Sequence, residues 1–298
     1  MGLSLCQSLF ATIAYADIFD YPLTGDEVAY WCIGRSFIHI TPIPGIEKKG
    51  EYFHLSHRES LVSTRKKRFA WSARKWKVAH AVAKLLARIP TIELVGVTGA
   101  LAMSNAKKDD DIDFFIITSP GTLWITRLLS VILVDRIGRR RKPGDTEVSD
   151  KVCLNMFMSA GSLRVPAKER DLFSAHETIQ MKPLWARDGM YARFLEANQW
   201  VQTFLPMAAR FVKDRTVMHR HVTDIHLVRS VAISFLRLLE PAARRAQLWY
   251  MKNRRTNEVI TDHMLRFHPR DARGWVKAAL ANRLATQNIP LDNVFYAS

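Results

Sequence analysis

Two short apolar runs, separated by a glycine turn and a polar loop, constrain the fold of this chain most. The first run covers residues 94–97 and leads into a turn at residues 98–100. The second run, residues 111–117, opens with acidic and apolar side chains in alternation. Apolar runs of about four to eight residues bounded by turn residues are typical of buried β-strands. The sequence therefore predicts two strands of a buried sheet near the centre of the chain.

The second of these strands carries a pair of carboxylates. Asp111 and Asp113 point to the same face, because alternate residues of a strand share a side. Their repulsion is costly unless a cation neutralises it, and Mg²⁺ and Mn²⁺ prefer oxygen ligands of this kind. Asp109 and Asp111 have the same spacing, but the apolar Ile112 favours the later pair. The upstream glycine turn offers backbone N–H groups to a phosphate, so the sequence predicts a site where a divalent metal meets a triphosphate.

The run from Val97 to Phe114 resembles the signature of the DNA polymerase beta-like nucleotidyltransferase superfamily, in which a glycine motif precedes two aspartates separated by an apolar residue. Further phrases resemble an uncharacterised bacterial family of nucleotidyltransferase-domain proteins; they lie at residues 16–23, 151–155, 175–177, 180–184 and 194–198. The resemblance covers most of residues 8–205. It implies that Asp111 and Asp113 bind the catalytic Mg²⁺ or Mn²⁺ and that the turn around Gly99 holds a nucleoside triphosphate such as ATP.

Two positions depart from the pattern of that superfamily. Ala100 stands where Gly or Ser is usual, so a hydroxyl that would contact phosphate is missing, although Thr98 could supply one. The third carboxylate usually lies on a later strand, but the strand expected at residues 151–159 carries Asn155 in its interior. Asp150, directly before that strand, is the predicted third acid, which would complete the metal's ligands and help to deprotonate the attacking hydroxyl. The predicted phosphate contacts are Thr98, Gly99, Ala100 and Lys108.

The chain carries 44 Lys and Arg against 28 Asp and Glu, a formal net charge of +16, which favours a polyanionic partner. Residues 58–89 form one long helical pattern with 10 basic and 1 acidic side chains, and Phe69 and Trp76 belong to its apolar side. This helix either grips phosphates, with Trp71 and Trp76 stacking on bases, or is a solvated connection between two parts of the chain.

The other basic segment is residues 191–298, with 17 basic and 8 acidic side chains and helical patterns throughout, including one at residues 257–267. Basic residues recur along one side of a helix kinked at Pro241, opposite Leu238, Leu239, Leu248 and Met251; they are Arg237, Arg244, Arg245, Lys252 and Arg255. RNA or DNA is therefore expected along residues 58–89 and this C-terminal basic helix.

The N-terminal segment has the outline of a winged-helix module. A helical pattern covers residues 7–19, a capping box at Thr24 and Glu27 opens a second helix, and residues 48–55 read as a β-hairpin. The place of a recognition helix is held by residues 37–44, which contain two prolines and cannot form a long helix. Residues 1–57 hold 3 basic and 6 acidic side chains, so a protein-docking or structural role is favoured over DNA reading.

Two short polar motifs leave alternatives open. His176 and Glu177 either line the nucleotide cleft or form a pair on a helix surface, and the second interpretation is favoured. The basic loop at residues 139–142 either contacts phosphate or is a solvated turn, with a slight preference for the turn.

These patterns predict an α/β chain of the α+β kind. It comprises a winged-helix-like module (1–57), a basic connecting helix (58–89), a nucleotidyltransferase core with a mixed sheet (90–190) and an all-helical C-terminal region (191–298). The predicted function is metal-dependent transfer of a nucleoside monophosphate from a nucleoside triphosphate to a hydroxyl, and the charge favours an RNA end as the acceptor. The alternative is a catalytically degenerate binder of nucleotide or nucleic acid with the same fold.

The expected location is the reducing cytoplasm. The three cysteines are widely spaced, which argues against a disulfide scaffold. The most apolar stretch, residues 123–137, is interrupted by charges and is shorter than the roughly 20 residues that span a bilayer. The N-terminus lacks the basic start of a secretory signal.

Overall fold

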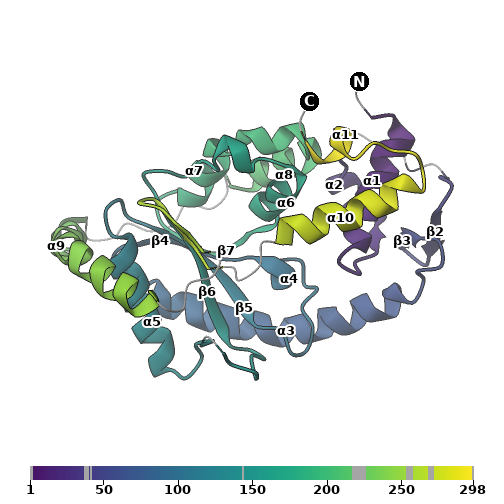
Figure 1. Cartoon of the computed structure of the whole chain (residues 1–298). Coiled ribbons are helices and arrows are strands. Elements are labelled where there is room, and N and C mark those ends of the chain that lie inside the picture. The colour runs from purple at the N-terminus through teal and green to yellow at the C-terminus, as the bar shows by residue number, and fades with distance from the viewer. Residues whose placement is uncertain are drawn as a thin grey trace.

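The computed structural model describes residues 3–36, 40, 42–142, 144–216, 226–252, 258–267 and 272–296. They form a six-stranded mixed sheet, a three-stranded antiparallel sheet and helices that surround both (Figure 1). The predicted α+β class is therefore confirmed.

The N-terminal segment contains α1 (Leu5–Asp17), β1 (Leu23–Thr24), α2 (Gly25–Tyr30), β2 (Ile46–Lys49) and β3 (Tyr52–Leu55). Its strands pair in the order β1-β3-β2. The predicted capping box is confirmed: the Thr24 hydroxyl accepts from the backbone N–H of Glu27, and the Glu27 carboxylate accepts from that of Thr24. Two helices and a hairpin thus form as their local signals predict.

The large sheet has the order β7-β4-β5-β6-β9-β8, with β4 and β5 antiparallel and β5 and β6 parallel. Its strands are β4 (Ile92–Val97), β5 (Ile112–Thr118), β6 (Val152–Ser159), β7 (Lys182–Ala186), β8 (Val259–Ile260) and β9 (Met264–Arg266). One face packs against α3 (Leu61–Leu86), α5 (Leu123–Arg136) and α9 (His226–Met251). The other face packs against α7 (Met190–Ala197) and the loop before β7, and the acid pair belongs to this second face.

The C-terminal region is not all-helical, so that prediction was wrong. Residues 258–267, predicted as a helix, form the hairpin of β8 and β9, and β9 extends the large sheet by pairing with β6. Thr261 stabilises the turn, since its hydroxyl accepts from the backbone N–H of His263 and Met264. The free edge of β6 supplies backbone partners that a helix could not use, and pairing there buries Leu265 completely.

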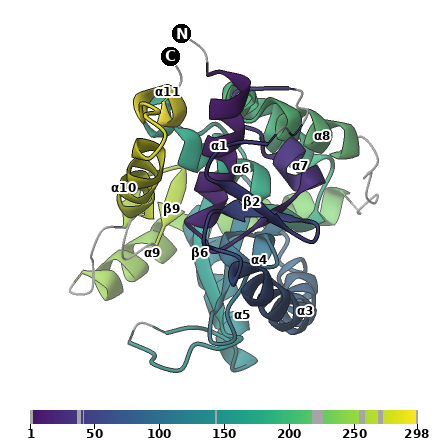
Figure 2. The same cartoon turned by 90° about the vertical axis from the view of Figure 1, so that its right-hand side faces the viewer.

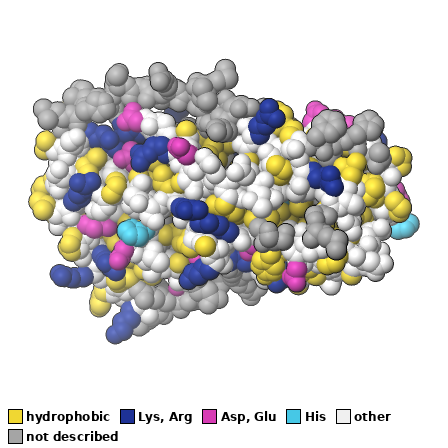
Figure 3. All heavy atoms as spheres, turned by 90° about the horizontal axis from the view of Figure 1, so that it is seen from above, with side chains coloured by type: hydrophobic (Ala, Val, Ile, Leu, Met, Phe, Trp, Pro, Cys, Tyr) yellow, Lys and Arg dark blue, Asp and Glu magenta, His cyan; other side chains and the backbone are white. Residues whose placement is uncertain are grey.

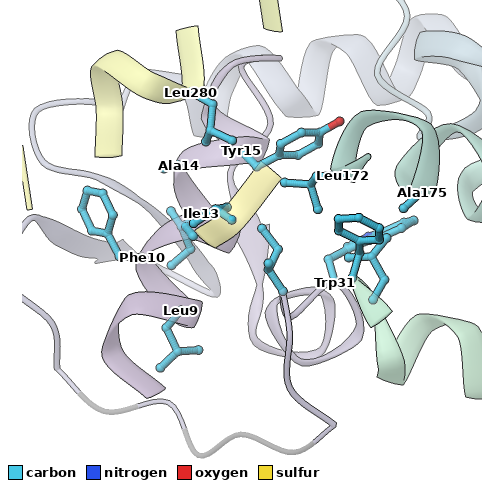
Figure 4. Close-up of a cluster of buried hydrophobic side chains, with 14 of the residues drawn as sticks. Leu9, Phe10, Ile13, Ala14, Tyr15, Trp31, Leu172, Ala175 and Leu280 are labelled. Atoms are coloured by element: carbon cyan, nitrogen blue, oxygen red, sulfur yellow. The ribbon is translucent and has the colours of Figure 1, made fainter. Parts of the chain in front are cut away.

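The N-terminal and C-terminal segments share one core. Buried side chains of α1 and α2 pack with those of α6 (Leu172–Gln180), α8 (Pro206–Thr216), α10 (Ala272–Ala285) and α11 (Asp292–Phe295). In Figure 4, Ile13 and Tyr15 of α1 lie beside Leu172 of α6 and Leu280 of α10. Figure 2 shows α1 between α10 and the region of α7 and α8. The segment predicted as an N-terminal module therefore does not enclose a core of its own.

Helix α3 buries two basic residues that the sequence placed among its solvated side chains. Arg68 donates to the carbonyl of Phe19 and to the carboxylate of Asp20, both at 2.9 Å, and Lys75 is 1% exposed. Phe69, predicted on the apolar side, is 65% exposed instead. Arg68 and Lys75 are buried because loop carbonyls from distant parts of the chain need hydrogen-bond donors, and these long side chains reach them.

The remaining described elements are short. They are α4 (Gly99–Ala102), a 3₁₀ turn at Ala167–Glu169 and another at Gln199–Thr203, which with α7 replaces the single helix expected from residue 191. No helix within the described residues is long and apolar enough to cross a membrane. On the face shown in Figure 3, Lys and Arg lie in small separate groups among apolar and acidic side chains. Nucleic-acid binding along α3 and α9 stays a prediction.

Candidate functional site

The start of β5 brings the two predicted metal ligands together with a cysteine. Ligand atoms of Asp111, Asp113 and Cys153 all lie within 4.8 Å of one another. Cys153 belongs to β6, and the parallel register of β5 and β6 places it directly beside Asp113. Asp111 and Asp113 therefore lie close together, as the alternation of side chains along a strand predicts. Cys153 joins them because β6 pairs with β5, and the sequence alone does not indicate that pairing.

The predicted glycine turn touches this acid pair. Gly99 has φ +64, and a Cβ atom placed there would lie 2.9 Å from Oδ2 of Asp113. The backbone N–H of Thr98 donates to the carbonyl of Asp113 at 3.0 Å. Only glycine combines this left-handed backbone with so close an approach of a carboxylate. The turn and the acid pair, separated along the sequence by a polar loop, thus meet in space.

Asn155 completes the polar end of the site. It is 3% exposed, and its amide Nδ2 donates to Oδ1 of Asp113 at 3.0 Å. Its Oδ1 is buried and accepts no hydrogen bond from the described residues. A buried oxygen without a donor is costly unless a cation or water satisfies it. With the two carboxylates it makes a set of oxygen donors that suits Mg²⁺ or Mn²⁺.

Arg141 reaches the acid pair from the basic loop. Its guanidinium donates to Oδ2 of Asp111 at 2.7 Å, and its side chain is 40% exposed. The neighbouring Asp111 holds the pKa of Arg141 above its ordinary value. The basic loop is therefore not a purely solvated turn, because one of its four basic residues lies at the site.

A cavity of about 660 Å³ opens from this polar end. Thr98, Gly99, Ala100 and Asn155 line it, whereas Asp111 and Asp113 do not. Its remaining wall combines aromatic and sulfur-containing side chains with charged ones, among them Arg68, Glu177 and Arg266. This volume is in the range of small-molecule binding sites. Three of the four predicted phosphate contacts thus border one cavity.

His176 and Glu177 line the same cavity, so the favoured interpretation of a helix-surface pair was wrong. The ring of His176 stacks on Tyr15, with centroids 3.9 Å apart, and lies near Trp31. Burial lowers the pKa of His176 to about 4, so the ring is neutral at physiological pH. Because His176 packs on Tyr15 of α1 and near Trp31 at the end of α2, the side of α6 that carries it faces the interior. The local sequence pattern does not indicate this orientation.

Glu177 is a buried acid without a cationic partner among the described residues. Its carboxylate accepts from the side chain of Gln180, and burial together with the charge of Asp113 raises its pKa to about 7. Several other acids with little exposure are paired with Lys or Arg, whereas Asp113 has the amide of Asn155 as its partner; the paired acids are Asp17, Glu27, Glu93, Asp150 and Asp171. An unpaired carboxyl facing a cavity and titrating near neutrality is typical of functional acids.

Glu177→Gln is expected to stabilise the fold at pH 8. Below pH 4.5 the carboxyl is protonated in both states; between 4.5 and about 7 only the unfolded chain ionises, so the wild type loses stability as pH rises. Above pH 7 the ionised Glu177 lowers the free energy of unfolding of the wild type by its full amount, on the order of 2 kcal/mol after allowance for partial exposure. Urea unfolding of both proteins at pH 4 and pH 8 measures it. An equal difference at the two pH values would contradict the assignment.

The two other predicted residues lie apart from the acid pair. The carboxylate of Asp150 binds Nζ of Lys75 at 3.0 Å and Nε of Arg74 at 3.1 Å, so its charge is already neutralised. The side chain of Lys108 is exposed and does not line the cavity, while its carbonyl accepts from Lys75 and Ser149. The structure brings Asp111, Asp113 and the turn at 98–100 together but not Asp150 or Lys108.

Sequence reasoning did not assign Cys153, Arg141 or Glu177 to the site. Each reaches it through pairing or packing between distant segments; Glu177 and the loop that contains Arg141 were considered as cleft residues, and Cys153 was not. Comparisons with protein-family models, with curated proteins and with solved structures found no match for this chain.

Proposed function

We propose that this protein transfers a nucleoside monophosphate from a nucleoside triphosphate to a hydroxyl group in a reaction that depends on Mg²⁺ or Mn²⁺. One observation carries the proposal: the Asp113 carboxylate lies against the Gly99 turn and against Asn155, whose Oδ1 is unsatisfied, and Gly99 and Asn155 both line a cavity. The resemblance of residues 97–114 to nucleotidyltransferases agrees with this arrangement. The same resemblance implies the metal and the triphosphate.

In this proposal Asp111, Asp113 and Asn155 hold the ion, and the turn at residues 98–100 binds the triphosphate. The ion would neutralise charge that develops on the phosphate oxygens. The acceptor oxygen bonds to the α-phosphorus while the bond to the β-phosphate oxygen breaks, and pyrophosphate leaves with the electron pair. Glu177 is the proposed acceptor of the hydroxyl proton, because its pKa of about 7 allows it to take up a proton at neutral pH. When the triphosphate binds, the guanidinium of Arg141 would release the carboxylate of Asp111 and bind a phosphate oxygen instead.

Asp113→Asn is the direct test. Each labelled nucleoside triphosphate is incubated with Mn²⁺ and with pooled RNA or a pool of small hydroxyl compounds, and incorporated label and released pyrophosphate are measured. Loss of the charge is expected to lower transfer about 1000-fold, as for groups that stabilise phosphoryl transition states. Asp109→Asn is the matched control, because Asp109 is an exposed acid of the same loop. Equal transfer by the two variants would rule out the acid pair as the catalytic site.

Binding of Mn²⁺ is expected to weaken as pH falls below about 7. Burial and the neighbouring Asp111 raise the pKa of Asp113 to about 7, so below that pH the ion has to displace a proton. Affinity should fall about tenfold per pH unit, measured by calorimetric titration with Mn²⁺ and a non-hydrolysable triphosphate. Affinity independent of pH would show that Asp113 is not a ligand.

A non-catalytic nucleotide binder is the second candidate. The ion pair between Arg141 and Asp111 favours it, because a guanidinium already neutralises one of the two carboxylates without a metal. Asn155 also cannot act as a base where the superfamily places its third acid. Tight binding of nucleotide with no transfer to either acceptor pool would support this candidate.

A further inference from the structure

The outer face of α9 is apolar, although the helix lies at the surface of the protein. Its large outward side chains are strongly exposed: Val228 66%, Val231 63%, Phe235 61%, Leu238 77%, Leu239 41% and Trp249 80%. Of the four residues predicted on the apolar side of the helix, Leu248 and Met251 pack in the core, whereas Leu238 and Leu239 face away from it. A surface helix ordinarily faces solvent with polar residues, but α9 carries apolar side chains on its outward face as well as on the inward face that contains Ala243 and Met251.

Polar contacts fix α9 in this orientation. The carboxylate of Glu240 accepts from the backbone N–H groups of Trp124 and Ile125, both at 2.8 Å, at the start of α5. Gln247 donates to the carbonyl of Trp124 at 2.8 Å, and Arg229 forms an ion pair with Glu93 at 2.5 Å. Figure 1 shows α9 beside α5 at one edge of the molecule. Because these bonds define the inward face, the exposed stripe points away from the protein.

The spacing of the stripe is that of a coiled-coil seam. Its members recur at intervals of three, four and seven residues, and they are Val228, Val231, Phe235, Leu238, Ala242 and Trp249, with Leu239 and Ala246 beside them. Such a repeat keeps one narrow face of a helix directed at a partner helix over several turns. The spacing therefore points to a helical partner.

The sizes of these side chains identify that partner as the same helix. A two-fold axis between Leu238 and Leu239 places Phe235 opposite Ala242 and Val231 opposite Ala246. The same operation places Trp249 opposite Val228. Large residues thus meet smaller ones, as a self-complementary interface requires. We propose that α9 pairs with α9 of a second copy of this chain, antiparallel, around a two-fold axis between Leu238 and Leu239.

Charge favours the antiparallel arrangement over a parallel one. Arg245 is exposed and occupies the position of the repeat between Ala242 and Trp249. In a parallel pair the two copies of Arg245 would lie side by side. In the antiparallel pair they lie about 20 Å apart along the axis, at about 1.5 Å of rise per residue. That distance exceeds the screening length of about 8 Å at physiological salt, so their repulsion is small.

Sedimentation equilibrium of the full chain tests the pairing. The wild type is expected to be a dimer at micromolar concentration, and Leu238→Asp is expected to raise the dissociation constant at least about 100-fold. Phe69→Asp is the matched control, because Phe69 of α3 is 65% exposed and lies outside the stripe. Circular dichroism verifies that both variants are folded. A monomeric wild type, or a Leu238→Asp variant that stays dimeric, overturns the proposal.

Crosslinking tests the direction of the two helices. In a Cys6→Ser background, which removes the exposed native thiol, Leu238→Cys should form a disulfide-linked dimer on oxidation. Val228→Cys should not, since its two copies would be about 30 Å apart along the axis. Equal crosslinking at both positions overturns the antiparallel arrangement. A monomer that floats with vesicles of anionic phospholipid also overturns the proposal and assigns the stripe to a lipid surface.

Discussion

Lys75→Met is expected to lower the free energy of unfolding by about 3–5 kcal/mol, because it leaves the buried Asp150 carboxylate with only the exposed Arg74 as a cation and removes the donor of two loop carbonyls. The ammonium group of Lys75 donates to Asp150 Oδ1 and to the carbonyl of Lys108, each at 3.0 Å, and to the carbonyl of Asp110 at 2.5 Å. Methionine preserves most of the volume but none of these bonds. Urea unfolding at neutral pH measures the loss.

Arg74→Met is the matched control for Lys75→Met. Arg74 binds the same carboxylate at 3.1 Å, but its side chain is 81% exposed, so its removal is expected to cost less than about 1 kcal/mol. Similar losses in the two variants would show that burial of Lys75 is not what stabilises the loop. Because this loop leads directly into Asp111, we also expect Lys75→Met to weaken Mn²⁺ binding, whereas Arg74→Met should not.

Gly99→Ala is expected to reduce transfer about 100-fold, since displacement of a reacting group by about 1 Å has effects of this size. The new methyl group would lie 2.9 Å from Oδ2 of Asp113, so the carboxylate has to move. The left-handed backbone at Gly99 adds about 1–2 kcal/mol of strain for any other residue. Transfer rate and Mn²⁺ affinity are the quantities to measure.

Gly138→Ala separates these two effects. Gly138 has nearly the same backbone angle, φ +66, but no heavy atom lies within 4 Å of a Cβ built there. Both variants should lose similar stability from backbone strain, and only Gly99→Ala should lose Mn²⁺ affinity. If Gly138→Ala lost as much affinity, the contact with Asp113 would not be the cause.

The elements with local signals were predicted from the sequence. The capping box at Thr24 and Glu27 needs only residues three apart, and the adjacency of Asp111 and Asp113 needs only the alternation of one strand. Both follow from short-range geometry. The class of the fold and the acid pair could therefore be inferred without a structure.

The features that sequence reasoning missed depend on distant partners. Arg68 and Lys75 are buried because loops far away along the chain present carbonyls and carboxylates to them. Residues 264–266 form a strand because the edge of β6 is free. Glu177 faces the cavity because α6 packs on α1. Tertiary contacts of this kind override the local preferences that a sequence pattern reports.

The shared core of the two chain ends has a consequence for biosynthesis. Helix α1 is synthesised well before α10, yet α10 packs against its apolar side. Elements with such remote partners fold late, after the intervening chain has been made. A nascent chain that has not yet reached α10 should therefore expose the apolar side of α1 and attract chaperones until α10 has been made.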